Sequence, residues 1–266
     1  MFKRIDHIGV VVRDIKEATD AYERLFGLKV AAQETIEERG LIAALVPTSN
    51  VRFEIMQPIN PESAVGRFIE RRGEGIQHIC FEVEDIRATI ATLKEREVQL
   101  IQGEPEGGFV GEVEFIHPRA ANGVLTEIAQ ITRHTPTEHD LRVHHVTIAA
   151  TDRDAAVENW SKSFDLKLNR MSERESAGII AGWLDAGDAE VEFAQQTSDE
   201  GPLARFIEER GAGVFGIVLE TDDAEGLTEH VRSQGLRVIE DPEGDNVIRV
   251  VHPQDFFGTL IMINQR

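Results

Sequence analysis

Four residues that could bind a metal ion occupy matching places in two similar stretches of this 266-residue chain. His7 lies in "IDHIGVVVRDI" and His78 in "IQHICFEVEDI", 71 residues further on. Glu54 in "FEIMQP" and Glu127 in "TEIAQI" are 73 residues apart. Imidazole nitrogens and carboxylate oxygens together form a ligand set that suits a borderline divalent ion. A structural zinc site would more often contain thiolates.

Each of these residues taken alone has a simpler interpretation. A single histidine in a strand is more often a core or surface residue than a ligand. The alternation in "VRFEIMQ" and "VLTEIAQ" places Glu54 and Glu127 opposite their apolar neighbours, which by itself predicts solvated side chains. The repeat changes this interpretation, because His7, Glu54, His78 and Glu127 all fall on equivalent positions. If the two stretches pack as pseudo-symmetric halves, the four side chains converge on one ion.

The elements that must position these residues follow one pattern. A strand through Val10–Val12 leads to Asp14, a helix N-cap with Glu17 three residues on, and the helix 15–26 stops at Gly27. Strands are predicted at 28–33, 41–46 and 51–57, which completes a βαβββ unit. The second unit runs over 76–131, with its helix from Asp85 to about Arg96. A connecting helix is predicted with Asn60 as N-cap and Pro61 at its first position.

The whole chain is also a tandem duplication. "RFIERRGEGIQHICFEVEDI" from Arg67 matches "RFIEERGAGVFGIVLETDDA" from Arg205 at an offset of 138, and "IHPRAANGVLTEIAQI" from Ile116 matches "VHPQDFFGTLIMINQR" from Val251 at an offset of 135. The prediction is therefore an α+β fold of four βαβββ units, arranged as a metal-binding domain at 1–132, a linker at 133–142 and a second domain at 143–266. The counterparts of the four ligands are His145, Glu192, Gly216 and Met262, so the second domain lacks a full metal site.

Composition limits the possible partners. A net charge of −20 argues against nucleic-acid binding, which depends on Lys and Arg meeting phosphates. No apolar run approaches the roughly 18 residues that cross a membrane. The single cysteine, Cys80, fits a reducing, cytoplasmic environment. We expect a small-molecule substrate and a monomer or a homodimer.

The motifs together resemble the vicinal oxygen chelate superfamily, whose members pair βαβββ units around a divalent metal. The first half is most similar to methylmalonyl-CoA epimerases in "IDHIGVVV", "GEGIQHICFEVEDI", "FIHPRAANGVLTEIAQ" and "PINPESAVGRFIERRG". The resemblance implies two tandem vicinal oxygen chelate domains, of which the second is a metal-free copy. It places the metal ligands at His7, Glu54, His78 and Glu127. The ion would be Co, Mn, Ni, Zn or Mg.

The same resemblance implies a metal-dependent epimerase or isomerase that removes a proton α to a thioester or carbonyl, with Glu127 as a catalytic residue and an acyl-CoA as a candidate substrate. Two departures leave the substrate open. The strand Leu41–Val46 has no ionisable residue where some relatives carry a second base, and Phe109 and Val110 stand where relatives carry a Gly-Gly turn. Three alternatives therefore stay open: a glyoxalase-type lyase, a dioxygenase, or a metal-free binding protein like the bleomycin-resistance members.

Overall fold

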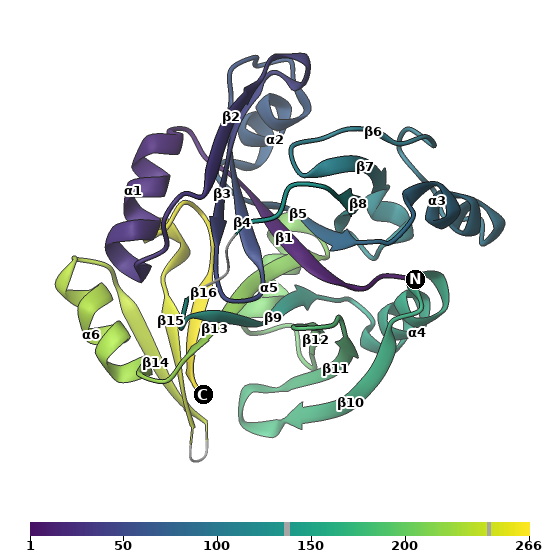
Figure 1. Ribbon diagram of the computed structural model, residues 1–266. Coiled ribbons are helices and arrows are strands. Elements are labelled where there is room, and N and C mark those ends of the chain that lie inside the picture. Colours follow the sequence, from purple (N-terminus) through teal and green to yellow (C-terminus); the bar gives the residue numbers. More distant parts are fainter. Residues whose placement is uncertain (136–138, 244–245) are drawn as a thin grey trace. The chain divides into compact units, whose positions relative to one another are not determined.

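The computed structural model of the protein describes residues 1–135, 139–243 and 246–266 (Figure 1). Part of the predicted linker, 136–138, lies outside the described residues, and the predicted domain boundaries stay a prediction. Among the helices in these described ranges, none combines the length and the apolar character needed to cross a membrane.

The chain repeats one βαβββ module four times, as the sequence predicts. The first module contains β1 (Arg4–Val11), α1 (Ile15–Phe26), β2 (Ala32–Ile36), β3 (Leu41–Pro47) and β4 (Arg52–Pro58). The second contains β5 (Gly75–Glu82), α3 (Ile86–Glu95), β6 (Glu106–Gly107), β7 (Gly111–Ile116) and β8 (Leu125–Ile131). The third contains β9 (Arg142–Ala149), α4 (Arg153–Phe164), β10 (Lys167–Arg174), β11 (Ile179–Asp185) and β12 (Glu190–Gln196). The fourth contains β13 (Gly213–Thr221), α6 (Ala224–Ser233), β14 (Val238–Glu243), β15 (Asn246–Val251) and β16 (Ile261–Gln265).

Short helices connect the modules and their strands. The helices α2 (Ala64–Arg72) and α5 (Pro202–Arg210) join the first module to the second and the third to the fourth. Single 3₁₀ turns are η1 (Glu37–Arg39), η2 (Pro118–Ala120), η3 (Glu175–Ala177) and η4 (Pro253–Asp255). The strands form two eight-stranded sheets with the same topology, in the orders β2-β3-β4-β1-β5-β8-β7-β6 and β10-β11-β12-β9-β13-β16-β15-β14. The α+β class with four repeated units is thereby confirmed.

One pair of polar residues starts the principal helix in every module. An aspartate caps each helix by accepting a hydrogen bond from the backbone N–H three residues on, and these residues are Asp14, Asp85, Asp152 and Asp223. A glutamine near the end of the last strand accepts the first N–H of the same helix, and these residues are Gln57, Gln130, Gln195 and Gln265. Each glutamine ties its helix to the strand that carries, or has lost, a predicted ligand.

Two element boundaries differ from the sequence prediction. The connecting helix α2 begins at Ala64 with Ser63 as its cap, because Asn60 instead accepts the N–H of Glu62 in a local turn. The second strand begins at Ala32 rather than Leu28. Leu28 belongs to the helix end, where its N–H bonds the Tyr22 carbonyl beyond the left-handed Gly27.

The chain divides into two compact units, and each unit combines modules from both halves of the sequence. Unit 1 contains Met1–Asp6, His78–His134 and His145–Phe215. Unit 2 contains His7–Gln77, Thr135–His144 and Gly216–Arg266. The second and third modules thus fall in unit 1 almost entirely, and the first and fourth fall in unit 2.

Aromatic side chains from both halves form the core of each unit. In unit 1 the ring of Phe2 stacks on Phe164 at 5.0 Å, and Phe81 meets Trp160 edge-on at 5.9 Å. In unit 2 the ring of Tyr22 lies 4.9 Å from that of Phe256. The helices α1 and α6 lie side by side in unit 2 although they come from opposite ends of the chain (Figure 1). Neither half of the sequence supplies a complete core by itself.

Candidate functional site

His7 and Glu54 form a buried pair within unit 2. The strands β1 and β4 run parallel with His7 opposite Arg52 and Gly9 opposite Glu54. The imidazole Nε2 of His7 lies 3.5 Å from Oε2 of Glu54. His7 is fully buried and Glu54 is 7% exposed.

His78 and Glu127 form an equivalent pair within unit 1. The strands β5 and β8 are also parallel, with His78 opposite Leu125 and Cys80 opposite Glu127. The imidazole Nε2 of His78 lies 3.6 Å from Oε2 of Glu127, and both residues are buried. In both pairs the glutamate follows, by two positions, the residue that faces the histidine. The duplication has therefore preserved register as well as residue type.

The structure buries both glutamates, although strand alternation alone predicts solvated side chains. Every residue of β4 from Arg52 to Met56 is buried, as are the residues of β8 from Thr126 to Ala129. These strands are covered on both faces, so a polar residue at an alternate position points into the protein. A carboxylate buried in this way requires a compensating partner.

The geometry of each pair fits a divalent ion. Two atoms that bind one ion at about 2.1 Å lie about 3.0–3.4 Å apart, depending on the bond angle. The measured separations of 3.5 and 3.6 Å are close to this range. Each pair offers one nitrogen and one oxygen atom, which is the mixed set that the sequence predicts for an ion. Binding of a single ion by both pairs together belongs to the function proposed below.

The third module keeps a His–Glu pair but surrounds it differently. Nε2 of His145 lies 3.4 Å from Oε2 of Glu192, which also accepts a 2.7 Å hydrogen bond from the Thr147 hydroxyl. The Arg174 guanidinium lies 3.7 Å from the other oxygen of Glu192. Burial alone would raise the pKa of Glu192, but the bonds from His145 and Thr147, with the charge of Arg174, hold that pKa below its usual range.

This carboxylate is therefore neutralised by the protein itself. Sequence reasoning identified His145 and Glu192 but missed Thr147 and Arg174. The only available signal was the duplication, because Arg174 stands where the first half has Ile36 at the same offset of 138. The remaining counterparts, Gly216 on β13 and Met262 on β16, supply no suitable ligand. The third module thus keeps a His–Glu pair at the equivalent position, but its glutamate is already paired with Thr147 and Arg174.

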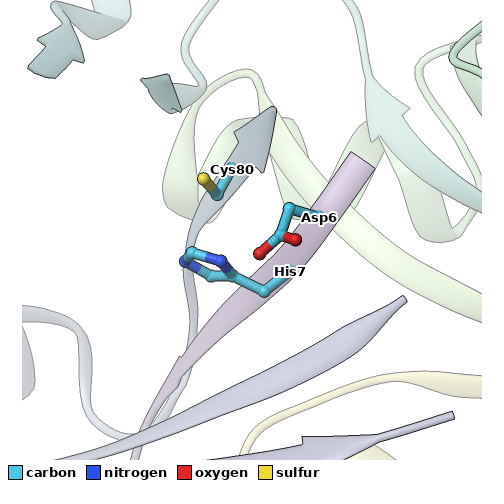
Figure 2. Close-up of side chains that lie close together, drawn as sticks. All are labelled: Asp6, His7 and Cys80. Carbon is cyan, nitrogen blue, oxygen red and sulfur yellow. The ribbon is translucent and has the colours of Figure 1, made fainter. Parts of the chain in front are cut away.

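Another buried carboxylate near these strands, that of Asp6, is explained by an ion pair. Asp6 is fully buried on β1, directly before His7, and lies within 4.8 Å of the Cys80 thiol on β5 (Figure 2). The Arg4 guanidinium lies 3.2 Å from Asp6 and 2.8 Å from Glu82. Arg4 thus compensates two carboxylates in unit 1. Sequence reasoning did not single out Asp6, since nothing in its spacing distinguishes it from other strand residues.

Comparison with known proteins places the chain in a family. The model of the glyoxalase/bleomycin resistance protein/dioxygenase superfamily matches residues 6–116 and again 144–251. The chain therefore belongs to this superfamily, and it carries the family's domain twice. The two matches agree with the internal duplication and with the four modules.

Individual relatives match about half of the chain. The uncharacterized protein YqjC of Bacillus subtilis is 36% identical over 138 residues, which are 52% of this chain and 99% of that protein. An ethylmalonyl-CoA/methylmalonyl-CoA epimerase of Cereibacter sphaeroides is 34% identical over 134 residues, 49% of this chain and 100% of that protein. A mutant of 4-hydroxymandelate synthase from Streptomyces coelicolor has a TM-score of 0.77 and 14% identity, covering 100% of this chain and 93% of that one. The last match shows that the fold is shared over the full length.

Proposed function

We propose that this protein is a metal-dependent epimerase or isomerase that abstracts a proton α to a thioester or carbonyl, with a methylmalonyl-type acyl-CoA as its substrate class. The observation that carries the proposal is the pair of equivalent buried His–Glu pairs, His7 with Glu54 and His78 with Glu127. The epimerase relative from Cereibacter sphaeroides supports the choice of reaction.

The four residues of these pairs would hold one divalent ion, with Co, Mn, Ni, Zn and Mg as candidates. When bound, such an ion supplies Lewis-acid stabilisation of the negative charge that develops on the enolate oxygen, worth several kcal/mol. Neutral imidazoles are needed for this role, because a protonated ring cannot act as a ligand. The second half would bind no ion, because the charge of Glu192 is already compensated by His145, Thr147 and Arg174.

Glu127 is the proposed base that accepts the α proton. Its carboxylate is buried beside His78, so water is excluded and electrostatic interactions within the site are strengthened. Epimerisation also requires a proton donor on the opposite face of the substrate. The strand β3, where some relatives carry that group, contains only Leu, Ile, Ala, Val and Pro residues. Glu127 is therefore one of the two acid–base groups, and the proton donor for the opposite face must come from an element other than β3.

The test is metal-dependent hydrogen exchange. Purified protein is stripped of metal and reconstituted with each candidate ion, and deuterium uptake at the α carbon of methylmalonyl-CoA in heavy water is followed by NMR. We expect exchange that requires the metal and falls at least about 100-fold in Glu127→Gln, since general base catalysis contributes about 10²–10⁴-fold. Glu192→Gln, the glutamate at the equivalent strand position of the third module, is the matched control and should exchange within about twofold of the wild type.

Two results would redirect this proposal. One bound ion per chain without any exchange would refute α-proton abstraction from this substrate and favour the glyoxalase-type lyase, which the uncharged β3 also permits. Two bound ions per chain would contradict a metal-free second half.

A further inference from the structure

The second and fourth modules differ around the partner strand of Glu127. In the second module Phe115 on β7 lies opposite Glu127 on β8. In the fourth module Val250 on β15 lies opposite Met262 on β16, in the same register. At the same place the third module has Trp183 opposite Glu192, and the first has Leu45 opposite Glu54.

Phe115 contacts the other member of the pair. Its ring meets the His78 imidazole edge-on, with centroids 5.8 Å apart and an interplanar angle of 88°. Such edge-to-face contacts stabilise a pair of rings beyond area burial and favour one ring orientation. Phe115 thus lies opposite Glu127 in the sheet while its ring rests on His78, and it bridges both residues of the pair.

The backbone of Phe115 is fixed by a buried carboxylate. Glu114 is fully buried and accepts hydrogen bonds from three backbone N–H groups, those of Phe115 at 2.7 Å, Gln102 at 3.1 Å and Gly103 at 2.5 Å. The Phe115 carbonyl accepts a further 2.8 Å bond from the N–H of Ile101. The equivalent positions in the first, third and fourth modules hold Ala44, Gly182 and Arg249, so this buried glutamate belongs to the second module alone.

The segment that binds Glu114 lies in the region where the first half of the chain is longer than the second. The offset between the halves falls from 138 to 135, so the first half has three additional residues before Ile116. In the fourth module β14 and β15 pair without a break from Val238 to Glu243. In the second module the ladder stops after Leu100 and resumes at Glu106, and two N–H groups within this break, those of Gln102 and Gly103, bind Glu114.

We infer that Phe115 is a positioning residue for the His78–Glu127 pair, and that Glu114 anchors it through the interrupted edge at 101–105. The Phe115 ring holds the His78 imidazole with Nε2 toward Glu127, so the two ligand atoms are arranged before an ion binds. Outer-shell partners of this kind typically change metal affinity or activity about 10–100-fold. The role of the pair as ligands rests on the proposed function, whereas the orientation of the ring does not.

The test compares Phe115→Val, which introduces the fourth module's residue, with Phe115→Tyr, which keeps the ring. Calorimetric titration of the metal-free proteins with Co²⁺ should show a dissociation constant raised about tenfold in the Val variant and within about twofold of wild type in the Tyr variant. Phe215→Val, on β13, truncates a ring that packs on Phe206 and should leave the affinity unchanged. The absorption bands of bound Co²⁺ should shift in the Val variant alone.

A second measurement separates this inference from the proposed function. Three-bond NMR couplings report the side-chain rotamer of His78 in the metal-free protein, and we expect one rotamer in the wild type and averaging in Phe115→Val. Averaging in a protein that never takes up Co²⁺ would leave the positioning role standing and refute the metal-dependent function. A rigid His78 in Phe115→Val, with wild-type Co²⁺ affinity and spectrum, would overturn the inference.

Discussion

At the scale of single residues, the duplication provides an internal comparison for each ligand. Gly216 occupies on β13 the place that His78 occupies on β5, and the residues after both positions form regular, buried strand. A histidine is thus not needed to form this strand. The buried imidazole of His78 lies 3.6 Å from Glu127, which is the arrangement that the proposed metal binding requires.

His78→Ala should therefore separate metal binding from stability. We expect the affinity for the divalent ion to fall at least about 100-fold, because one of the four proposed ligands is lost. The free energy of unfolding of the metal-free protein should fall by no more than about 2 kcal/mol, within the usual range for one substitution. Metal content by mass spectrometry and urea unfolding of metal-free samples check both values. His145→Ala should keep one bound ion. A His78→Ala protein that retains the ion would remove His78 from the site.

At the scale of elements, the ends of helices were predictable and cross-strand contacts were not. The helix α1 begins after Asp14 and ends at Gly27 as predicted, because helix caps act within three or four residues of sequence. Asn60 was placed wrongly, since a turn and a cap use the same side-chain chemistry and differ only in context. Alternation within one strand predicts that Glu54 and Glu127 are solvated. Only the repeat, which puts them at equivalent positions, indicated that they point toward a shared site. Thr147 on β9 and Arg174 on β10 both contact Glu192 on β12. The spacing of residues within any one of these strands does not indicate such a contact.

That three-strand contact has a predicted pH dependence. Because the folded pKa of Glu192 lies below its ordinary value of 4.5, its ionised form stabilises the folded state at neutral pH, and this contribution is lost as the pH falls through the folded pKa. Glu192→Gln should be less stable than wild type at pH 7 by about 1–3 kcal/mol. The difference should narrow steadily below pH 4.5.

Urea unfolding of both proteins between pH 7 and pH 3 measures this difference. Thr147→Val, which removes one of the bonds to Glu192, should show a smaller loss with the same direction of pH dependence. A gap between wild type and Glu192→Gln that widens on acidification would contradict the assigned ionisation of Glu192.

At the scale of the whole molecule, the sequence duplication and the compact units do not coincide. The sequence repeats as two successive halves, each of which forms one sheet, and unit 1 and unit 2 each combine one module from either half. Hydrogen bonds between halves occur within both units. In unit 1 the Arg96 guanidinium donates to Asp165 at 2.8 Å, and in unit 2 Asn50 donates to the Val143 carbonyl at 2.8 Å. Sequence repeats report ancestry, and they do not state which copies share a core.

The isolated fragments 1–132 and 143–266 should therefore not fold independently. Fragment 1–132 would leave Phe2, Phe81 and Tyr22 without the rings of the other half. Truncating one buried aromatic side chain to alanine typically costs about 3–5 kcal/mol, and a domain is stable by only about 5–15 kcal/mol. We expect each fragment at low micromolar concentration to lack a cooperative thermal transition, and an equimolar mixture to regain the transition together with metal binding. A monomeric fragment 1–132 that unfolds cooperatively near the temperature of the full chain would show instead that the second half is dispensable to the core of the first.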